Sequence, residues 1–141
     1  MAARATAEWK GDIPTGSGTF TAGDSLSGEY SFKSRFEDGP GANPEQLIAG
    51  AHASCFSMAL TNVLGDQGAT VESVKTDAKV TLRLLEEGPT ITKIELTTVG
   101  RVPGVDDETF QAAAQAAKEG CPISKALAGV PEITLEATLE S

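Results

Sequence analysis

The stretch NPEQLIAGAHASCFSMALTNVL, from Asn43 to Leu64, decides the fold expected for this chain. Asn43 is a favourable N-cap residue, Pro44 suits the first helical position and Glu45 complements the positive end of the helix dipole. Gly65 follows the stretch and predicts its end. Between these signals the residues are nearly all small or apolar, so we expect a long central helix that is buried on most sides.

A cysteine, Cys55, lies in the middle of this helix, and the chain has one other, Cys121. Two cysteines in an intracellular protein are more often free, redox-active or buried than joined in a static structural disulfide. Cys121 follows Gly120 at the start of a short predicted helix, where the helix dipole lowers a thiol pKa, whereas Cys55 gains little in mid-helix. From the residues alone, Cys121 is therefore the better nucleophile and Cys55 a small core residue.

The single histidine, His52, precedes Cys55 by three residues and can share its helix face. A Cys–His dyad is one interpretation, and a packed or hydrogen-bonded histidine is the favoured one. A structural zinc site needs four ligands, and His52, Cys55 and Cys121 are the only His and Cys side chains, so we expect no metal. The cysteines lie 66 positions apart, which also excludes a thioredoxin-type Cys-x-x-Cys motif.

Length and charge describe a soluble protein. The 141 residues fit a single domain, 1–141, that is large enough to bury a core. A net charge of −9 argues against nucleic acid and an anionic membrane as partners. No apolar run approaches the roughly 20 residues that span a bilayer, and the N-terminus has no hydrophobic signal region. We therefore expect a cytoplasmic protein.

Strand and helix patterns follow one another irregularly along the chain. We expect strands over 2–10, 16–23, 29–33, 71–84, 91–102 and 132–140, and helices over 43–64, 109–120 and 121–129. The segment 34–42 is rich in Gly, Pro and charge and is expected to be a loop. The two long alternating segments break at Gly88 and Pro89 and predict a hairpin. This order predicts an α+β fold with mainly antiparallel sheet packed against helices.

Two segments of the chain resemble a known family. They are Arg35–Leu60, RFEDGPGANPEQLIAGAHASCFSMAL, and Gly120–Ser124, GCPIS, and they are similar to the OsmC/Ohr family of thiol-dependent hydroperoxide reductases. The similarity in element order extends from Trp9 to the last strand, and HASCFSMAL is more similar to the OsmC branch than to the Ohr branch. The resemblance implies an OsmC-like fold that forms an intertwined homodimer, with active sites at the subunit interface.

The resemblance also implies an enzyme, a peroxidase, and its residues. Cys55 matches the peroxidatic thiol, which becomes a sulfenic acid, and Cys121 matches the resolving thiol, which forms a disulfide with it. Arg35 and Glu45 match the family's active-site arginine and glutamate. The implied substrates are organic hydroperoxides, with hydrogen peroxide as a second candidate, and the implied reductant is a thiol such as a dihydrolipoyl group. The implied role is defence against oxidative or osmotic stress, without a cofactor.

The chemistry of these residues agrees with the implied roles. Arg35 is always cationic and can stabilise a thiolate or orient a peroxide, and Glu45 can hold it in a bidentate pair. Without the resemblance, Glu45 would be interpreted as a charge that complements the helix dipole. An apolar wall formed by Phe36, Phe56 and Met58 would favour a bulky organic hydroperoxide.

The length of the central helix adds a prediction about the dimer. Glu45 and Cys55 are ten residues apart, roughly 15 Å along a helix axis. Both cannot contact one small substrate from the same straight helix. Either Glu45 acts indirectly, or it serves the Cys55 of a second subunit. The second option agrees with the intertwined homodimer that the resemblance implies, so we expect Arg35 and Glu45 to serve the Cys55–Cys121 pair of a second subunit.

Two other functions stay open at this point. One is a non-enzymatic OsmC-like dimer that binds an apolar small molecule, with its cysteines merely buried. The other is a thiol redox sensor whose oxidised state is recognised by another protein.

Overall fold

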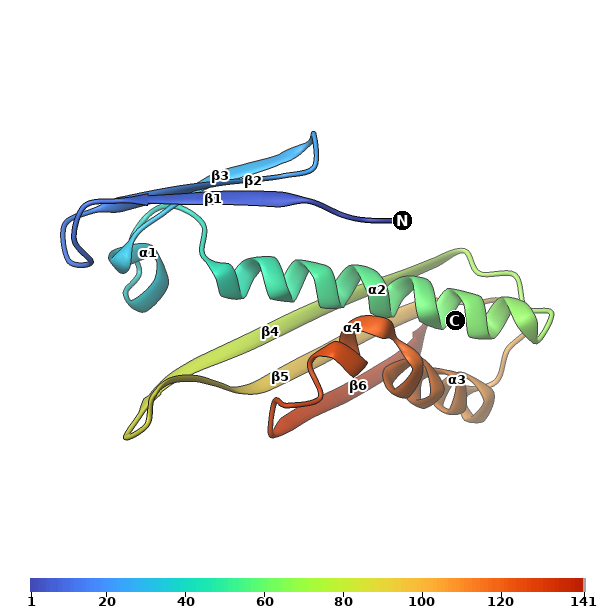
Figure 1. Ribbon diagram of the computed structural model, residues 1–141. Coiled ribbons are helices and arrows are strands. Elements are labelled where there is room, and N and C mark those ends of the chain that lie inside the picture. Colours follow the sequence, from blue (N-terminus) through green and yellow to red (C-terminus); the bar gives the residue numbers. More distant parts are fainter. Residues whose placement is uncertain (141) are drawn as a thin grey trace. The chain divides into compact units, whose positions relative to one another are not determined.

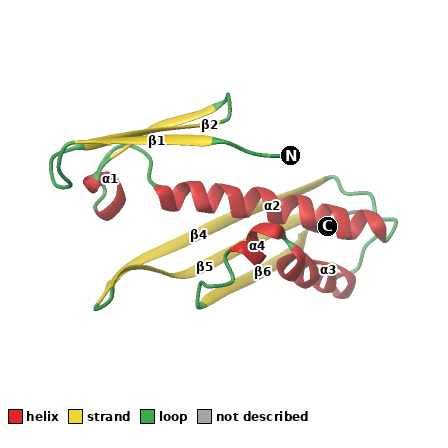
Figure 2. Cartoon of the chain, in the orientation of Figure 1, coloured by secondary structure: helices red, strands yellow, loops and turns green. Residues whose placement is uncertain are grey.

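The structure is a computed structural model that describes residues 1–140. The chain divides into two compact units, Met1–Leu47 and a second unit that begins at Ile48. Each unit has its own three-stranded sheet. The element order, β-β-β-α-α-β-β-α-α-β, confirms the α+β class; Figure 1 labels the elements and Figure 2 colours them by type.

The first unit holds an antiparallel sheet of three strands in sequence order, β1 (Ala5–Lys10), β2 (Ser17–Ala22) and β3 (Leu26–Tyr30). Trp9 of β1 and Tyr30 of β3 both pair with Gly18 of the central strand. The ring centroids of Trp9 and Tyr30 are 5.6 Å apart, and a Cβ at position 18 would lie 2.5 Å from the tyrosine ring. Gly18 therefore permits this aromatic pair to form across the sheet.

A short helix, α1 (Phe32–Phe36), follows the sheet. The predicted strand over 29–33 therefore matches β3 only at residues 29 and 30, and the predicted loop over 34–42 begins only after residue 36. Ser31 and Ser34 form a capping box. The Ser34 N–H donates to Ser31 Oγ at 3.1 Å, and the Ser31 N–H donates to Ser34 Oγ at 2.8 Å. This reciprocal cap satisfies N–H groups of the first turn and stabilises a five-residue helix where composition indicates a loop.

The predicted central helix is confirmed as α2 (Pro44–Asp66). The Gln46 N–H donates to Asn43 Oδ1 at 2.8 Å, as expected of an N-cap. The helix continues through Gly65, and the chain turns at Gly68, whose φ of +85° glycine adopts without strain. The helix therefore ends later than its first glycine predicts.

In the single chain, α2 is buried along one face only, so the prediction of burial on most sides is wrong. His52, Phe56, Leu60 and Leu64 recur every four residues, and each is 0% exposed. Met58, in contrast, is 76% exposed. Residues four apart on a helix share a face, whereas residues two apart do not. Although α2 is apolar in composition, only one of its faces is therefore buried.

By length and composition alone, α2 is also the one helix of the described residues that could cross a membrane. Its 23 residues include an 18-residue window with a mean hydropathy of 1.4, so the expectation that no apolar run approaches a membrane span is wrong. The core helix of a soluble protein meets the same test, and Phe56, Leu60 and Leu64 belong to the core of the second unit.

The second unit contains a three-stranded sheet in the order β4 (Ser73–Leu85), β5 (Gly88–Arg101) and β6 (Glu132–Glu140). β4 and β5 form the predicted antiparallel hairpin. β6 pairs with β5 in parallel, which is an exception to the mainly antiparallel pairing expected from sequence. A parallel neighbour needs a crossover connection, and α3 (Asp107–Gly120) and α4 (Pro122–Ala126) supply it.

The core of the second unit joins α2 and α3 to the sheet. Its buried members are Phe56, Leu60, Leu64, Ile94, Leu96, Val102, Phe110, Ala113, Ala114 and Ala117. Three of them are alanines on one face of α3, and such small side chains allow close packing of the helix. This packing sets the position of the end of α3, and with it Cys121, relative to the middle of α2.

Candidate functional site

The two cysteines meet within the second unit. Cys55 lies in the middle of α2, and Cys121 joins α3 to α4, with its N–H donating to the carbonyl of Ala117 at 2.9 Å. The two Sγ atoms are 2.9 Å apart, in hydrogen-bond contact, and both thiols are free. A disulfide has a sulfur–sulfur distance of about 2.05 Å, so a movement of about 1 Å converts this contact into a bond.

The surroundings of the two thiols differ. Burial raises the pKa of Cys55, and the hydrogen bond with Cys121 raises it further. Burial also raises the pKa of Cys121, but the neighbouring polar groups of Cys55 and Ser124 outweigh burial, so the pKa of Cys121 lies below its ordinary value. The pKa shifts of the two contacting thiols therefore have opposite directions, and the two thiols titrate as a pair.

His52 lies one helical turn before Cys55 and is fully buried. Its Nε2 is 2.7 Å from Ser124 Oγ, and its Nδ1 is a buried atom without a hydrogen-bond partner among residues 1–140. Burial lowers the pKa of His52, so its imidazole is neutral at neutral pH. The favoured interpretation, a hydrogen-bonded histidine, is confirmed. The sequence analysis did not identify its partner, Ser124. The available signal was the spacing, because Ser124 lies three residues after Cys121, just as Cys55 lies three residues after His52.

Arg35 and Glu45 meet within the first unit. α1 presents Arg35, and Glu45 lies in the first turn of α2 with its side chain only 9% exposed. Arg35 Nε and Nη2 lie 3.0 and 2.9 Å from the same oxygen, Glu45 Oε1, while Oε2 is buried without a partner in the described chain. The predicted bidentate pair is therefore wrong in detail, because both donors converge on one oxygen.

Two members of the predicted apolar wall, Phe56 and Met58, do not share a surface within the second unit. Phe56 belongs to the core of the second unit, and Met58 lies on the exposed side of α2. Phe36 packs against Phe32 of α1, with ring centroids 5.0 Å apart, in the first unit. Residues 56 and 58 are two apart on α2 and therefore lie on different faces of the helix.

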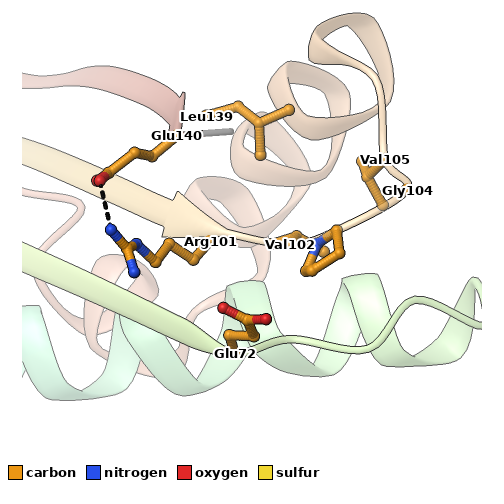
Figure 3. A pocket seen from close by; sticks show the side chains of 8 residues that line it. Glu72, Arg101, Val102, Gly104, Val105, Leu139 and Glu140 are labelled. Atoms are coloured by element: carbon orange, nitrogen blue, oxygen red, sulfur yellow. Dashed lines mark hydrogen bonds and ion pairs between the residues drawn. The ribbon is translucent and has the colours of Figure 1, made fainter.

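A separate pocket of about 400 Å³ lies at the end of the second unit's sheet (Figure 3). It is lined by Glu72, Arg101, Val102, Pro103, Gly104, Val105, Leu139 and Glu140. Arg101 Nη2 pairs with Glu140 Oε1 at 2.9 Å, so the one cation of the lining is already neutralised. Neither thiol lines this pocket. Within residues 1–140, no group of three or more His, Cys, Asp or Glu side chains is placed to hold a metal ion.

Comparison with known proteins gives a consistent picture. The model of the OsmC-like protein family matches residues 37–136. Peroxiredoxin OsmC of Escherichia coli (strain K12) is 46% identical over 96% of this chain and 94% of its own length. Organic hydroperoxide resistance protein OhrB of Bacillus subtilis (strain 168) is 38% identical over 68% of this chain and 69% of its own length. The crystal structure of OhrB superposes with a TM-score of 0.70 at 28% identity, covering 99% of this chain and 98% of that chain.

Proposed function

Because the chain belongs to the OsmC-like family, we propose that it is a thiol-dependent peroxidase that reduces organic hydroperoxides and, as a second substrate, hydrogen peroxide. Relatives named peroxiredoxin and organic hydroperoxide resistance protein support this class of activity. The observation that carries the proposal is the 2.9 Å contact between the Cys55 and Cys121 sulfurs. The proposed role is defence against oxidative and osmotic stress.

The proposed reaction has two steps on the protein. The Cys55 thiolate attacks the hydroperoxide, so that an S–O bond forms, the O–O bond breaks, and the alkoxide leaves and takes up a proton to become an alcohol. The sulfur is oxidised by two electrons to a sulfenic acid. The Cys121 thiolate then attacks the Cys55 sulfur, the disulfide forms, and hydroxide leaves and is protonated to water. An external dithiol, such as a dihydrolipoyl group, reduces the disulfide.

The first step needs a cation near Cys55, because the contacts of the second unit raise the pKa of this thiol. The proposal assigns this role to Arg35, whose charge is permanent and whose side chain remains 38% exposed. Glu45 holds the guanidinium through its Nε and Nη2 groups and so orients it toward substrate.

The proposal includes a cytoplasmic homodimer in which Arg35 and Glu45 of one protomer serve Cys55 and Cys121 of the other. Glu45 and Cys55 lie ten positions apart on α2, roughly 15 Å along the helix, which is too far for both to contact one small peroxide. The exposed side of α2 around Met58 offers apolar surface for a partner. The family match spans 37–136 and so crosses the boundary between the units, which supports one domain over 1–141.

The test of the proposed function is a peroxide-consumption assay that compares cumene hydroperoxide with hydrogen peroxide, with dithiothreitol as reductant. We expect Cys55→Ser to abolish turnover, and Cys121→Ser to allow one round of oxidation and then stall. Ser54→Ala is a matched control, because it removes an exposed hydroxyl beside Cys55 that bonds only the Gly50 carbonyl.

Three outcomes would contradict the proposal. A Cys55→Ser protein that consumes peroxide at the wild-type rate rules out the mechanism. Stoichiometric oxidation without turnover under any dithiol indicates a redox sensor. Thiols that show no mass change after one equivalent of hydroperoxide indicate a non-enzymatic binding protein.

A further inference from the structure

Two side-chain contacts join α2 to the segment that carries Cys121, and the proposed mechanism uses only one of them. The first is the contact of 2.9 Å between the Cys55 and Cys121 sulfurs. The second joins His52 Nε2 to Ser124 Oγ at 2.7 Å. His52 is 0% exposed and Ser124 is 9% exposed, so water competes little for this hydrogen bond. A buried hydrogen bond therefore accompanies the pair of reacting sulfurs.

The two contacts have the same spacing on both helices. His52 precedes Cys55 by three residues on α2, and Ser124 follows Cys121 by three residues at the start of α4. Side chains three residues apart share a helix face, and those of the N-cap and the third helical residue also lie close together. The two contacts therefore join one face of α2 to one face of α4, and the two helices lie side by side in Figure 1.

The position of α4 depends on such contacts. The helix has five residues, and within the described chain no side-chain hydrogen bond caps it at Cys121. The Cys121 N–H donates to the Ala117 carbonyl at 2.9 Å, which ties the start of the segment to α3 rather than to α2. A helix this short has little stability of its own, so tertiary contacts decide where it lies. While the thiols are reduced, the hydrogen bond between His52 and Ser124 is therefore placed to fix α4 against α2.

We propose that the His52–Ser124 hydrogen bond holds Cys121 in position over Cys55 and thereby promotes formation of the disulfide. Both partners are positioning residues, because they act through the placement of α4. The inference rests on the proposed peroxidase function, in which Cys121 resolves the oxidised Cys55, and deepens it. It holds whichever of the two atoms donates, because an imidazole nitrogen and a hydroxyl form one hydrogen bond in either tautomer.

The step that benefits is the attack of Cys121 on the sulfenic acid of Cys55. The Cys121 sulfur supplies the electron pair of the new S–S bond and loses its proton, and the S–O bond of Cys55 breaks toward oxygen. The departing hydroxide takes up that proton and leaves as water, so the step needs no further oxidant or reductant. A contact that already holds the two sulfurs together spares the chain the entropy of bringing them into reach, and this raises the rate.

The same hydrogen bond should shift the equilibrium between dithiol and disulfide. Without it, α4 gains conformational freedom in the dithiol form, whereas in the oxidised form the disulfide still holds α4 against α2. Its loss therefore favours the dithiol and raises the reduction potential of the Cys55–Cys121 pair. This equilibrium involves no peroxide, so it can be measured whether or not the protein is a peroxidase.

The first experiment equilibrates the full-length protein with mixtures of reduced and oxidised dithiothreitol. The two protein thiols are oxidised to the disulfide while oxidised dithiothreitol is reduced, and mass spectrometry after alkylation with N-ethylmaleimide separates the two forms of the protein. We expect Ser124→Ala to lower the equilibrium constant for disulfide formation about three- to tenfold, the effect of one buried hydrogen bond. A tenfold change corresponds to a rise of about 30 mV in the reduction potential.

The second experiment measures the rate in a single turnover of the reduced protein with one equivalent of cumene hydroperoxide. Dimedone traps the sulfenic acid at successive times, and mass spectrometry separates its adduct from the disulfide. We expect Ser124→Ala to slow the conversion of sulfenic acid to disulfide about three- to tenfold. Formation of the sulfenic acid should keep its wild-type rate.

A double-mutant cycle separates the hydrogen bond from a merely structural role of its partners. His52→Leu should lower the equilibrium constant as Ser124→Ala does, and the double variant should lower it no further, because both changes remove one contact. His52→Gln places an N–H near the position of Nε2 and should retain the wild-type constant. Thr98→Val is the matched control, because it removes a fully buried hydroxyl of β5 that contacts Thr76. It should lower stability without moving the equilibrium.

Wild-type equilibrium constants in both Ser124→Ala and His52→Leu would overturn the inference, and so would effects that add in the double variant or an equal effect of Thr98→Val. If His52→Leu fails to fold, Ser124→Ala and His52→Gln, compared with Thr98→Val, carry the test. A wild-type protein that forms no dimedone adduct would overturn the proposed function instead. The equilibrium with dithiothreitol then still tests the hydrogen bond, and an unchanged constant in Ser124→Ala overturns its proposed role.

Discussion

Glu45 Oε2 and His52 Nδ1 are buried side-chain atoms without a hydrogen-bond partner in the described chain. An unsatisfied buried polar atom costs on the order of 1–3 kcal/mol, so such atoms are uncommon. Glu45 is proposed to act through Arg35, and His52 is bonded to Ser124 through its other ring nitrogen. In both residues one polar atom makes a short contact and the other has none.

His52 also makes stability depend on pH. Burial lowers its folded pKa below the unfolded value, so below about pH 6.5 the unfolded chain binds a proton that the folded chain does not. The contribution of neutral His52 to the free energy of unfolding is therefore complete at neutral pH and is lost as the pH falls. As the pH falls from about 6.5 to the folded pKa of His52, the free energy of unfolding of the wild type should decrease more steeply than that of His52→Gln. We expect the difference to be up to about 1.4 kcal/mol per pH unit.

Urea denaturation of the two proteins at a series of pH values measures this difference. The carboxylates of the chain titrate in both proteins. Subtracting the free energy of unfolding of His52→Gln from that of the wild type at each pH therefore leaves the contribution of His52. Parallel stability curves for the wild type and His52→Gln would contradict a buried neutral histidine.

At the scale of elements, two five-residue helices present the side chains of interest. α1 carries Arg35, and α4 begins directly after Cys121 and carries Ser124. Helices this short have little intrinsic stability, so their geometry depends on caps and on tertiary contacts. The Ser31–Ser34 capping box performs this role for α1, and the hydrogen bond from Asn43 Nδ2 to the Ser34 carbonyl, at 2.9 Å, ties α1 to the residue before α2.

Loss of this cap should affect activity through Arg35. Ser34→Ala removes the hydroxyl that accepts from Ser31, at a cost of about 1 kcal/mol in stability. We expect slower sulfenic acid formation at Cys55 and an unchanged rate of the later disulfide step. Trapping of the sulfenic acid with dimedone, followed by mass spectrometry, measures both steps. Lys33→Ala, an exposed change on the same helix, is the control. An unaltered first step in Ser34→Ala would show that α1 does not need its cap to place Arg35.

At the scale of the whole molecule, the Arg35–Glu45 pair belongs to the first unit and the thiols to the second. The proposed dimer assigns the two halves of one active site to different protomers. This arrangement can be tested by mixing inactive subunits, because a site shared between protomers is restored by complementary partners.

We predict that a heterodimer of Arg35→Ala and Cys55→Ser protomers, purified through two different tags, is active. If the site is shared, one of its two sites combines an intact Cys55 with an intact Arg35, and the heterodimer shows about half of the wild-type rate. Both parent homodimers should be inactive and serve as controls. A heterodimer as inactive as its parents would mean that Arg35 serves the thiol of its own chain.

The sequence alone predicts the features that depend on neighbours in the chain. Asn43 and Pro44 predict where α2 begins, and alternating residues predict the β4–β5 hairpin, because caps and side-chain periodicity act over a few residues. The motifs around Cys55 and Cys121 are likewise local, and they led to the family that the comparisons show. The helix α1 escaped prediction because its cap uses two serines within a segment whose composition indicates a loop.

Tertiary structure alone decided which distant groups meet. The parallel pairing of β6 with β5 depends on the crossover through α3 and α4, and the buried face of α2 depends on what packs against it. The sulfurs of Cys55 and Cys121 are 66 residues apart in sequence, and His52 and Ser124 are 72 apart. No local signal specifies such pairs, because their contact results from the packing of α3 and α2 in one core, and this packing gives each thiol its partners and its pKa.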